Sequence, residues 1–222
     1  MDFKRVTLVC GHYGSGKTNI AVNMAYELKK KEAQTAVADL DIVNPYFRTL
    51  DFKDDFEKRG IRLICSAYAN SNIDAPALPQ EMYAITDDRS YHVIVDVGGD
   101  DRGALALGRI SGAIVQENDF DMYMVINRYR PLTENVDDLL EIRNEIEAAA
   151  RIRFTGLINN SNLGSATTPA DVLHSLAYAE EASERMQLPV AATAYDQRLD
   201  AELRSKVPNP FPMELRAQIP GI

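Results

Sequence analysis

Residues 6–18 read VTLVCGHYGSGKT. The run opens with Val6 to Cys10, a short apolar and β-branched segment that is typical of a buried β-strand. It continues with GHYGSGKT at 11–18, which fits the pattern G-x-x-x-x-G-K-[ST]. From Lys17 to Lys31 the apolar residues recur at helical spacing. A strand, a glycine-rich loop and a helix in this order predict a phosphate-binding loop.

The residue types of this loop suit phosphate chemistry. Glycines let backbone N–H groups turn inward around phosphate oxygens, and the start of the following helix adds its dipole and free amides. We expect Lys17 to reach the β and γ phosphates and to act in catalysis, and the Thr18 hydroxyl to ligate Mg²⁺. The alternative is a glycine-rich turn that merely connects a strand to a helix. The residues expected to contact the nucleotide are Gly11, His12, Tyr13, Gly14, Ser15, Gly16, Lys17, Thr18 and Asn19.

The rest of the chain alternates short β-branched runs with longer helical patterns. This alternation predicts an α/β protein whose mostly parallel sheet carries helices on both faces. One helix is expected to be capped at Thr133, and another to begin at Thr168 and Pro169, with Asp171 completing the start signal. Further strands are expected at 35–40, 61–64, 92–97, 122–126, 154–159 and 189–193, and further helices within 46–58, 80–87 and 199–206.

Two of the expected strands end in carboxylates. One strand ends with Asp39 and Asp41, and another ends with Asp96 and Val97 before the glycine pair that ends with Gly99. In a parallel sheet these side chains emerge at the same edge as the phosphate loop, where an aspartate can hold the Mg²⁺ shell or orient the attacking water. The glycines let a backbone N–H approach the γ-phosphate. An aspartate at a strand end often only caps the next helix, but two such ends beside a phosphate loop favour the metal role.

Composition and charge argue against some classes of binding partner. The 222 residues carry 24 Lys and Arg against 33 Asp and Glu, a formal net charge of −9, which argues against general affinity for nucleic acid or an anionic membrane. No apolar run approaches the ~20 residues of a membrane helix, and the amino-terminal sequence is not typical of a signal peptide. Without repeats or linkers, residues 1–222 are expected to form a single nucleotide-binding domain. We therefore expect a cytoplasmic protein.

Several motifs resemble those of the MinD/ParA-type P-loop ATPases, which belong with the nitrogenase iron protein and the cobyrinate amidotransferase-related domains. These motifs are GHYGSGKT at 11–18, DLDIVNP at 39–45 and VIVDVGG at 93–99. GLINNS at 156–161 is similar to the adenine-contacting strand end of the nitrogenase iron protein. LP at 188–189, followed by AYD at 194–196, resembles the family's last strand and base-covering loop. The resemblance implies the three-layer P-loop NTPase fold.

The resemblance also implies roles for individual residues. Asp41 would be the catalytic carboxylate that orients water, and Asp39 and Asp96 would support the Mg²⁺ shell with Thr18 and Asp41. Asn160 would read adenine and Asp196 would lie in the loop near the base, while the absence of an N-K-x-D guanine-reading pattern favours ATP over GTP. The implied activity is slow, Mg²⁺-dependent ATP hydrolysis by a protein that dimerises with a second copy when ATP binds.

The phosphate loop departs from the family at one position. The family typically places a lysine directly after the first glycine, and that lysine reaches the partner's nucleotide across the dimer. Here the position is His12, followed by Tyr13 where a glycine is usual. Because histidine is only partly charged near neutral pH, one hypothesis is a weaker or pH-dependent contact across the dimer. The other is that His12 only packs or bonds locally.

Other segments carry weaker signals. Cys10 and Cys65 lack the paired arrangement that holds the iron–sulfur cluster of the nitrogenase iron protein, so no cluster is expected. The run NRYRP at 127–131 follows a strand at the ligand edge and is interpreted either as a solvated loop or as a contact for an acidic group or a partner. Residues 43–48, just after Asp41, are the segment expected to meet a client protein or substrate.

Three functions remain open at this point. The first is an ATP-driven dimer or conformational switch. The second is a small-molecule enzyme on the same fold that phosphorylates a carboxylate, as dethiobiotin synthetase and cobyrinate amidase relatives do. The third is a nucleotide-binding adaptor that does not hydrolyse ATP, which the missing lysine makes plausible. The sequence indicates the nucleotide and does not indicate the client.

Overall fold

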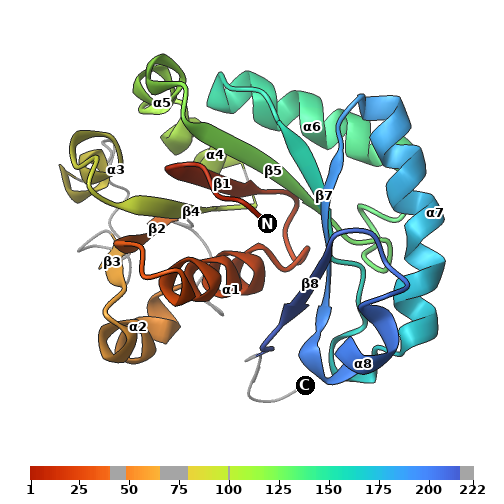
Figure 1. Cartoon of the computed structure of the whole chain (residues 1–222). Coiled ribbons are helices and arrows are strands. Elements are labelled where there is room, and N and C mark those ends of the chain that lie inside the picture. Colours follow the sequence, from red (N-terminus) through yellow and green to blue (C-terminus); the bar gives the residue numbers. More distant parts are fainter. Residues whose placement is uncertain (41–48, 66–79, 100, 216–222) are drawn as a thin grey trace.

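The computed structural model describes residues 1–40, 49–65, 80–99 and 101–215 (Figure 1). At its centre, eight strands form one parallel sheet in the order β3-β2-β4-β1-β5-β6-β7-β8. The predicted α/β fold with a parallel sheet is confirmed. The strands are β1 (Val6–Cys10), β2 (Thr35–Leu40), β3 (Arg62–Ile64), β4 (His92–Val97), β5 (Phe120–Ile126), β6 (Gly156–Asn159), β7 (Val190–Asp196) and β8 (Pro210–Met213).

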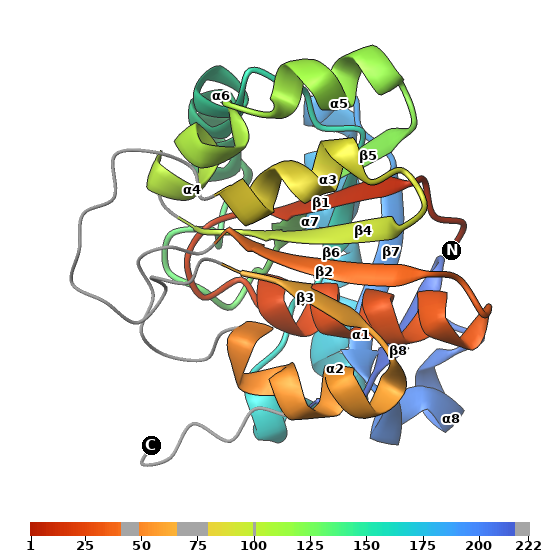
Figure 2. The same cartoon turned by 90° about the vertical axis from the view of Figure 1, so that its left-hand side faces the viewer.

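Helices cover both faces of this sheet, as predicted. Figure 2 shows α1 and α2 on one side, with α3, α4, α5 and α6 on the other. The α-helices are α1 (Lys17–Lys30), α2 (Lys53–Arg59), α3 (Ala84–Asp87), α4 (Asp101–Leu107), α5 (Ser111–Glu117), α6 (Val136–Ala150), α7 (Pro169–Met186) and α8 (Asp200–Leu203). Short 3₁₀ turns lie at Thr49–Phe52, Gln80–Tyr83, Gly164–Ala166 and Gln197–Leu199. None of the helices in these described ranges combines the length and apolarity needed to cross a membrane.

Strand β1 shows how the two faces are filled. Val6 and Leu8 belong to the apolar cluster that includes residues of α4, α5, α6 and α7, whereas Val9 belongs to the cluster around α1 and α2. Because both faces are covered, β1 is buried along its whole length. This is why the strand is a nearly continuous run of apolar and β-branched residues rather than an alternating one.

The strand order decides which loops meet. Strand β1 lies between β4 and β5, so the loop after β1 is flanked by the loops after these two strands. All the strands run in the same direction, and their carboxyl ends therefore lie at one edge of the sheet, the edge where such sheets bind ligands.

The starts of α6 and α7 test the capping predictions. Helix α7 begins as predicted, with a reciprocal capping box between Thr168 and Asp171. The prediction for α6 was wrong by two residues, because its N-cap is Asn135, whose side chain accepts a hydrogen bond from the Asp138 N–H at 2.9 Å. Thr133 instead donates its hydroxyl to the Asn127 carbonyl at 2.6 Å. The Thr133 hydroxyl is therefore used in a contact just after the end of β5, and it does not cap the helix as the local sequence pattern predicts.

The carboxyl-terminal part differs most from the sequence prediction. Strand β7 continues to Asp196 instead of ending at residue 193, because β8 pairs with it and places Met213 opposite Asp196. Residues 194–196 are therefore strand, so a base-covering loop can begin only at the end of β7, after Asp196, and the helix expected at 199–206 shortens to α8. Strand β8 was not predicted because it contains Pro210 and Pro212, which are tolerated here at the edge of the sheet.

Helices α4 and α5 were also not predicted, because glycines interrupt their sequence. The structure gives two of these glycines a packing role. A Cβ on Gly103 in α4 would lie 2.6 Å from the backbone nitrogen of Gly98, and one on Gly108 would lie 2.5 Å from the carbonyl oxygen of Ala149 in α6. The absence of side chains lets α4 approach both the loop after β4 and helix α6.

Candidate functional site

The loop between β1 and α1 has the backbone of a phosphate-binding loop. Gly16 has φ of 92°, in the left-handed region, and a Cβ there would lie 2.2 Å from the side-chain nitrogen of Asn160. Glycine is therefore required both for the conformation and for the close approach. The N–H of Ser15 donates to the His12 carbonyl at 3.2 Å and closes the turn.

Helix α1 begins at this loop with an amino terminus suited to an anion. Its N-cap residue is Gly16, no side chain caps it, and its first turn contains no acidic residue. Lys17 is buried at 6% exposure, and its Nζ donates to the His12 carbonyl at 3.2 Å. A positive helix end and a lysine ammonium thus converge on the same loop, which is the arrangement that binds phosphate groups.

Hydroxyl and carboxylate groups gather beside the start of α1. The hydroxyls of Thr18 and Thr49 donate to the same oxygen of Asp96, at 2.8 and 2.7 Å. Asp96 is 1% exposed, and Asp39, 5% exposed, is its partner in the register between β2 and β4. The sequence singled out three of these four residues. No sequence motif indicated Thr49, because this residue meets Asp96 of β4 only in the folded chain.

This cluster suits a hard divalent cation. Its donors are hydroxyl and carboxylate oxygens, the ligands that Mg²⁺ prefers. Among the described residues, no group of three or more His, Cys, Asp or Glu side chains could hold a metal alone. Nucleotide-bound Mg²⁺ needs no such cage, because it takes one or two protein ligands and completes its shell with phosphate oxygens and water. The donor set fits a cation that arrives with a nucleotide.

Gly99, at the end of the glycine pair after β4, lies directly against the phosphate loop. A Cβ on Gly99 would lie 2.7 Å from Lys17 Nζ and 2.7 Å from the backbone nitrogen of Tyr13. The loop after β4 therefore meets the residues that would surround a terminal phosphate, and only a glycine fits there.

Two residues that the resemblance links to the base make protein contacts here. Asn160, 2% exposed, donates its side-chain amide to the Ser15 carbonyl at 2.7 Å and so braces the phosphate loop. Asp196 forms an ion pair with Arg198 at 2.8 Å and accepts the N–H of Arg198 at 3.0 Å. Arg198 in turn donates to the carbonyls of Ser165 and Thr167 at 2.6 and 3.0 Å, which ties the end of β7 to the segment before α7.

His12, which stands where the family typically has a lysine, makes a local contact within this chain. The Nδ1 of His12 lies 3.1 Å from the Tyr13 carbonyl oxygen, while Tyr13 itself is 59% exposed. This contact fits the hypothesis of local bonding, and a contact across a dimer stays a prediction. Asp41 and residues 43–48 lie outside the described residues, so the catalytic and client-binding predictions for them stay predictions as well.

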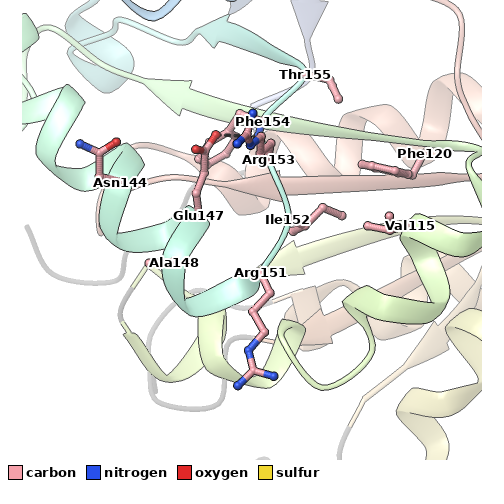
Figure 3. Close-up of a pocket in the computed structure, with 10 residues that line it drawn as sticks. All are labelled: Val115, Phe120, Asn144, Glu147, Ala148, Arg151, Ile152, Arg153, Phe154 and Thr155. Atoms are coloured by element: carbon pink, nitrogen blue, oxygen red, sulfur yellow. Dashed lines mark hydrogen bonds between the residues drawn. The ribbon is translucent and has the colours of Figure 1, made fainter.

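A second hollow, of about 650 Å³, lies at the opposite edge of the sheet (Figure 3). Phe120 and Thr155 line it at the amino-terminal sides of β5 and β6, together with Glu147 of α6. The Glu147 carboxylate accepts hydrogen bonds from Arg143 and from the Phe154 N–H, at 3.3 and 3.0 Å. Its polar group is therefore used in packing, and the hollow lies far from the phosphate loop.

Comparisons with known proteins agree with this geometry. The family model described as the CobQ/CobB/MinD/ParA nucleotide binding domain matches residues 6–166, which include the phosphate loop, Asp96 and Asn160. No curated protein sequence matches the chain.

Solved structures of FtsY proteins share the fold. FtsY from Mycoplasma mycoides matches with a TM-score of 0.58 and 16% identity over 85% of this chain and 60% of its own. The cell division protein FtsY from Thermotoga maritima matches with a TM-score of 0.57 and 17% identity over 86% and 60%. The signal recognition particle receptor FtsY from Elizabethkingia anophelis, in complex with GDP, matches with a TM-score of 0.53 and 18% identity over 86% and 57%. The chain thus spans less than two thirds of the length of these proteins.

Proposed function

The chain belongs to the CobQ/CobB/MinD/ParA nucleotide-binding domain family, and we propose that it is a Mg²⁺-dependent ATPase that switches between two conformational or oligomeric states. The observation that carries the proposal is the meeting of Lys17, Thr18, Asp96 and Gly99 around one glycine-rich loop. This arrangement provides a cradle for phosphates, a cation for their charge and oxygen ligands for a metal.

Each residue would change its partner when the nucleotide binds. Lys17 would leave the His12 carbonyl and pair with phosphate oxygens, a stronger charge-assisted contact. The Thr18 hydroxyl, now a donor to Asp96, would offer its lone pairs to the metal, and Asp96 would hold metal-bound water. Mg²⁺, when bound, supplies neutralisation of the phosphate charge. Asp41 is proposed from the resemblance to orient the attacking water.

ATP is proposed as the nucleotide because the chain contains no N-K-x-D motif to read guanine. Asn160, held on the phosphate loop by its bond to Ser15, is proposed to contact the adenine edge, and Asp196 to lie beside the base. GTP is the competing nucleotide in the test below.

The switch is proposed to act through the contacts made by Gly99 and Thr49. Both belong to segments that reach the phosphate loop and Asp96 from neighbouring strands. A γ-phosphate that moves Lys17 or Asp96 must therefore move these segments, and its loss on hydrolysis would release them. Dimerisation with a second copy on ATP binding is the proposed result.

The test is hydrolysis of ATP and GTP by the purified protein with Mg²⁺, followed together with its mass by light scattering. Slow ATP hydrolysis that is lost in Lys17→Ala and Asp41→Ala, with a mass change on ATP binding, is the expected result. Faster turnover of GTP would overturn the choice of nucleotide. ATP binding without turnover or mass change would overturn the switch, and a metabolite-stimulated rate would show the small-molecule enzyme instead.

A further inference from the structure

The loop between β5 and α6 is fixed by buried polar side chains. Asn127 and Thr133 are each 1% exposed. The side-chain oxygen of Asn127 accepts the Tyr129 N–H at 3.0 Å, and its carbonyl accepts the Thr133 hydroxyl at 2.6 Å. Buried polar groups cost free energy unless they are paired, so this bonding specifies one loop conformation.

Neighbouring elements hold the same loop from outside. The Tyr129 hydroxyl donates to the Asp171 carbonyl in α7 at 2.8 Å, and the Arg128 N–H donates to the hydroxyl of Ser161 at 3.0 Å. The sequence left open whether residues 127–131 form a solvated loop or a contact surface. The loop is held on the segment after β6 through the Arg128 N–H, and on α7 through the Tyr129 hydroxyl.

The anchored loop presents Arg130 to the phosphate loop. A Cβ on Gly14 would lie 3.9 Å from both Cδ and Nε of Arg130. The side chain is exposed, and no carboxylate of the described residues forms an ion pair with it. A guanidinium therefore lies against the backbone that would surround the phosphates.

Arg128, on the same loop, lies differently. Its charge acts on the hydroxyl of Tyr178 in α7, where it opposes the rise in the tyrosine pKa that burial causes. The two arginines are both exposed and are separated by one residue, but only Arg130 approaches Gly14. Arg128 is thus a matched control for charge and exposure.

We propose that Arg130 is a phosphate-binding residue for the nucleoside di- or triphosphate held by the loop, and that it supplies the permanent positive charge that position 12 lacks. This inference rests on the proposed nucleotide site. A guanidinium suits the role because it stays charged at all relevant pH values and can donate two parallel hydrogen bonds to phosphate oxygens. A histidine at position 12 does not provide such a permanent charge.

The test is calorimetric titration of the whole chain with ATP, ADP and adenosine. Arg130→Gln is expected to weaken binding of ATP and ADP by about ten-fold or more, the effect of losing a charged hydrogen bond. Arg130→Lys should recover part of the loss, Arg128→Gln should stay within about two-fold, and adenosine binding should be the same in all variants. Because Arg130 is exposed, these variants are expected to fold, which circular dichroism checks.

The outcomes separate this inference from the proposed function. Unchanged ATP affinity in Arg130→Gln, an equal loss in Arg128→Gln, or a loss that is as large for adenosine as for ATP would each overturn the role of Arg130. If Lys17→Ala still loses ATP binding in those cases, the nucleotide site itself stands. A wild-type chain that binds neither ATP nor GTP overturns both.

Discussion

Asp39 of β2 and Asp96 of β4 occupy paired positions in the register of two neighbouring parallel strands, and both are buried. Paired positions place the two carboxylates on the same face of the sheet, at the carboxyl edge beside Thr18. Carboxylate oxygens on adjacent strands are the ligands that a divalent cation such as Mg²⁺ prefers. The two carboxylates therefore lie at the proposed site of the metal that a nucleotide would bring.

Replacing Asp39 by Asn is expected to reduce the response to Mg²⁺. In the wild type, Mg²⁺ with ATP should raise the melting temperature more than ATP with EDTA does, because a bound ligand stabilises the folded state. Asp39→Asn should lose most of this additional rise, whereas Asp119→Asn, an exposed change before β5, should keep it. An undiminished Mg²⁺ increment in Asp39→Asn, measured by differential scanning fluorimetry, would remove Asp39 from the metal site.

Thr49→Val is expected to lower the free energy of unfolding by about 1–2 kcal/mol, because it removes a buried donor to Asp96 at nearly constant volume. Thr49→Ser keeps the hydroxyl and should recover most of the hydrogen-bond contribution. Urea unfolding of the two variants and the wild type checks this. A loss in Thr49→Ser without a loss in Thr49→Val would show that the methyl group of Thr49, and not its hydroxyl, matters.

Gly99→Ala is expected to weaken nucleotide binding by on the order of ten-fold or more, since displacing a site by ~1 Å is enough for losses of this size. The added Cβ would overlap Lys17 Nζ and the Tyr13 nitrogen. Gly112→Ala is the control: its Cβ meets nothing within 4 Å in helix α5, so it should bind nucleotide normally and gain about 0.5–1 kcal/mol of stability. Nucleotide titrations of both variants decide the point, and normal binding by Gly99→Ala would contradict the close contact.

The ion pair between Arg5 and Glu117 gives a prediction about pH. Hydrogen bonding and the charge of Arg5 lower the pKa of Glu117 below its ordinary value of 4.5, although burial opposes this. The pair therefore stabilises the fold above that value, and its contribution is lost as the pH falls through the lowered pKa. Glu117→Gln should cost about 2–3 kcal/mol at pH 7, and the difference from the wild type should shrink below pH 4.5.

Urea unfolding across pH 3–7 tests this expectation, with Glu27→Gln as the control. Glu27 forms an exposed pair with Lys30 in α1, and its loss should change stability by less than about 0.5 kcal/mol at any pH. A cost for Glu117→Gln that does not vary with pH would show that packing, not charge, explains the effect.

The sequence predicted those features that depend on local pattern. The glycine-rich loop was predicted from its motif, and most strands were predicted from apolar runs. Asp39 and Asp96 were predicted as site residues because they lie at strand ends. Thr49 and Arg130 acquire their contacts only through strand order, which brings distant loops together, and no local pattern records that order. Asn135 caps α6 in place of Thr133 for a more local reason, because the Thr133 hydroxyl donates to the carbonyl of Asn127, just after β5.

The glycine contacts of α4 have a mechanical consequence. Gly99 touches Lys17 and Tyr13, Gly103 rests on Gly98, and Gly108 rests on the backbone of α6. The contacts of Gly103 with Gly98, of Gly108 with α6 and of Gly99 with Tyr13 are made with backbone atoms, so a small displacement there cannot be absorbed by rotation of a side chain. We therefore expect a shift of the phosphate loop to be transmitted through α4 and into α6 by direct backbone contacts.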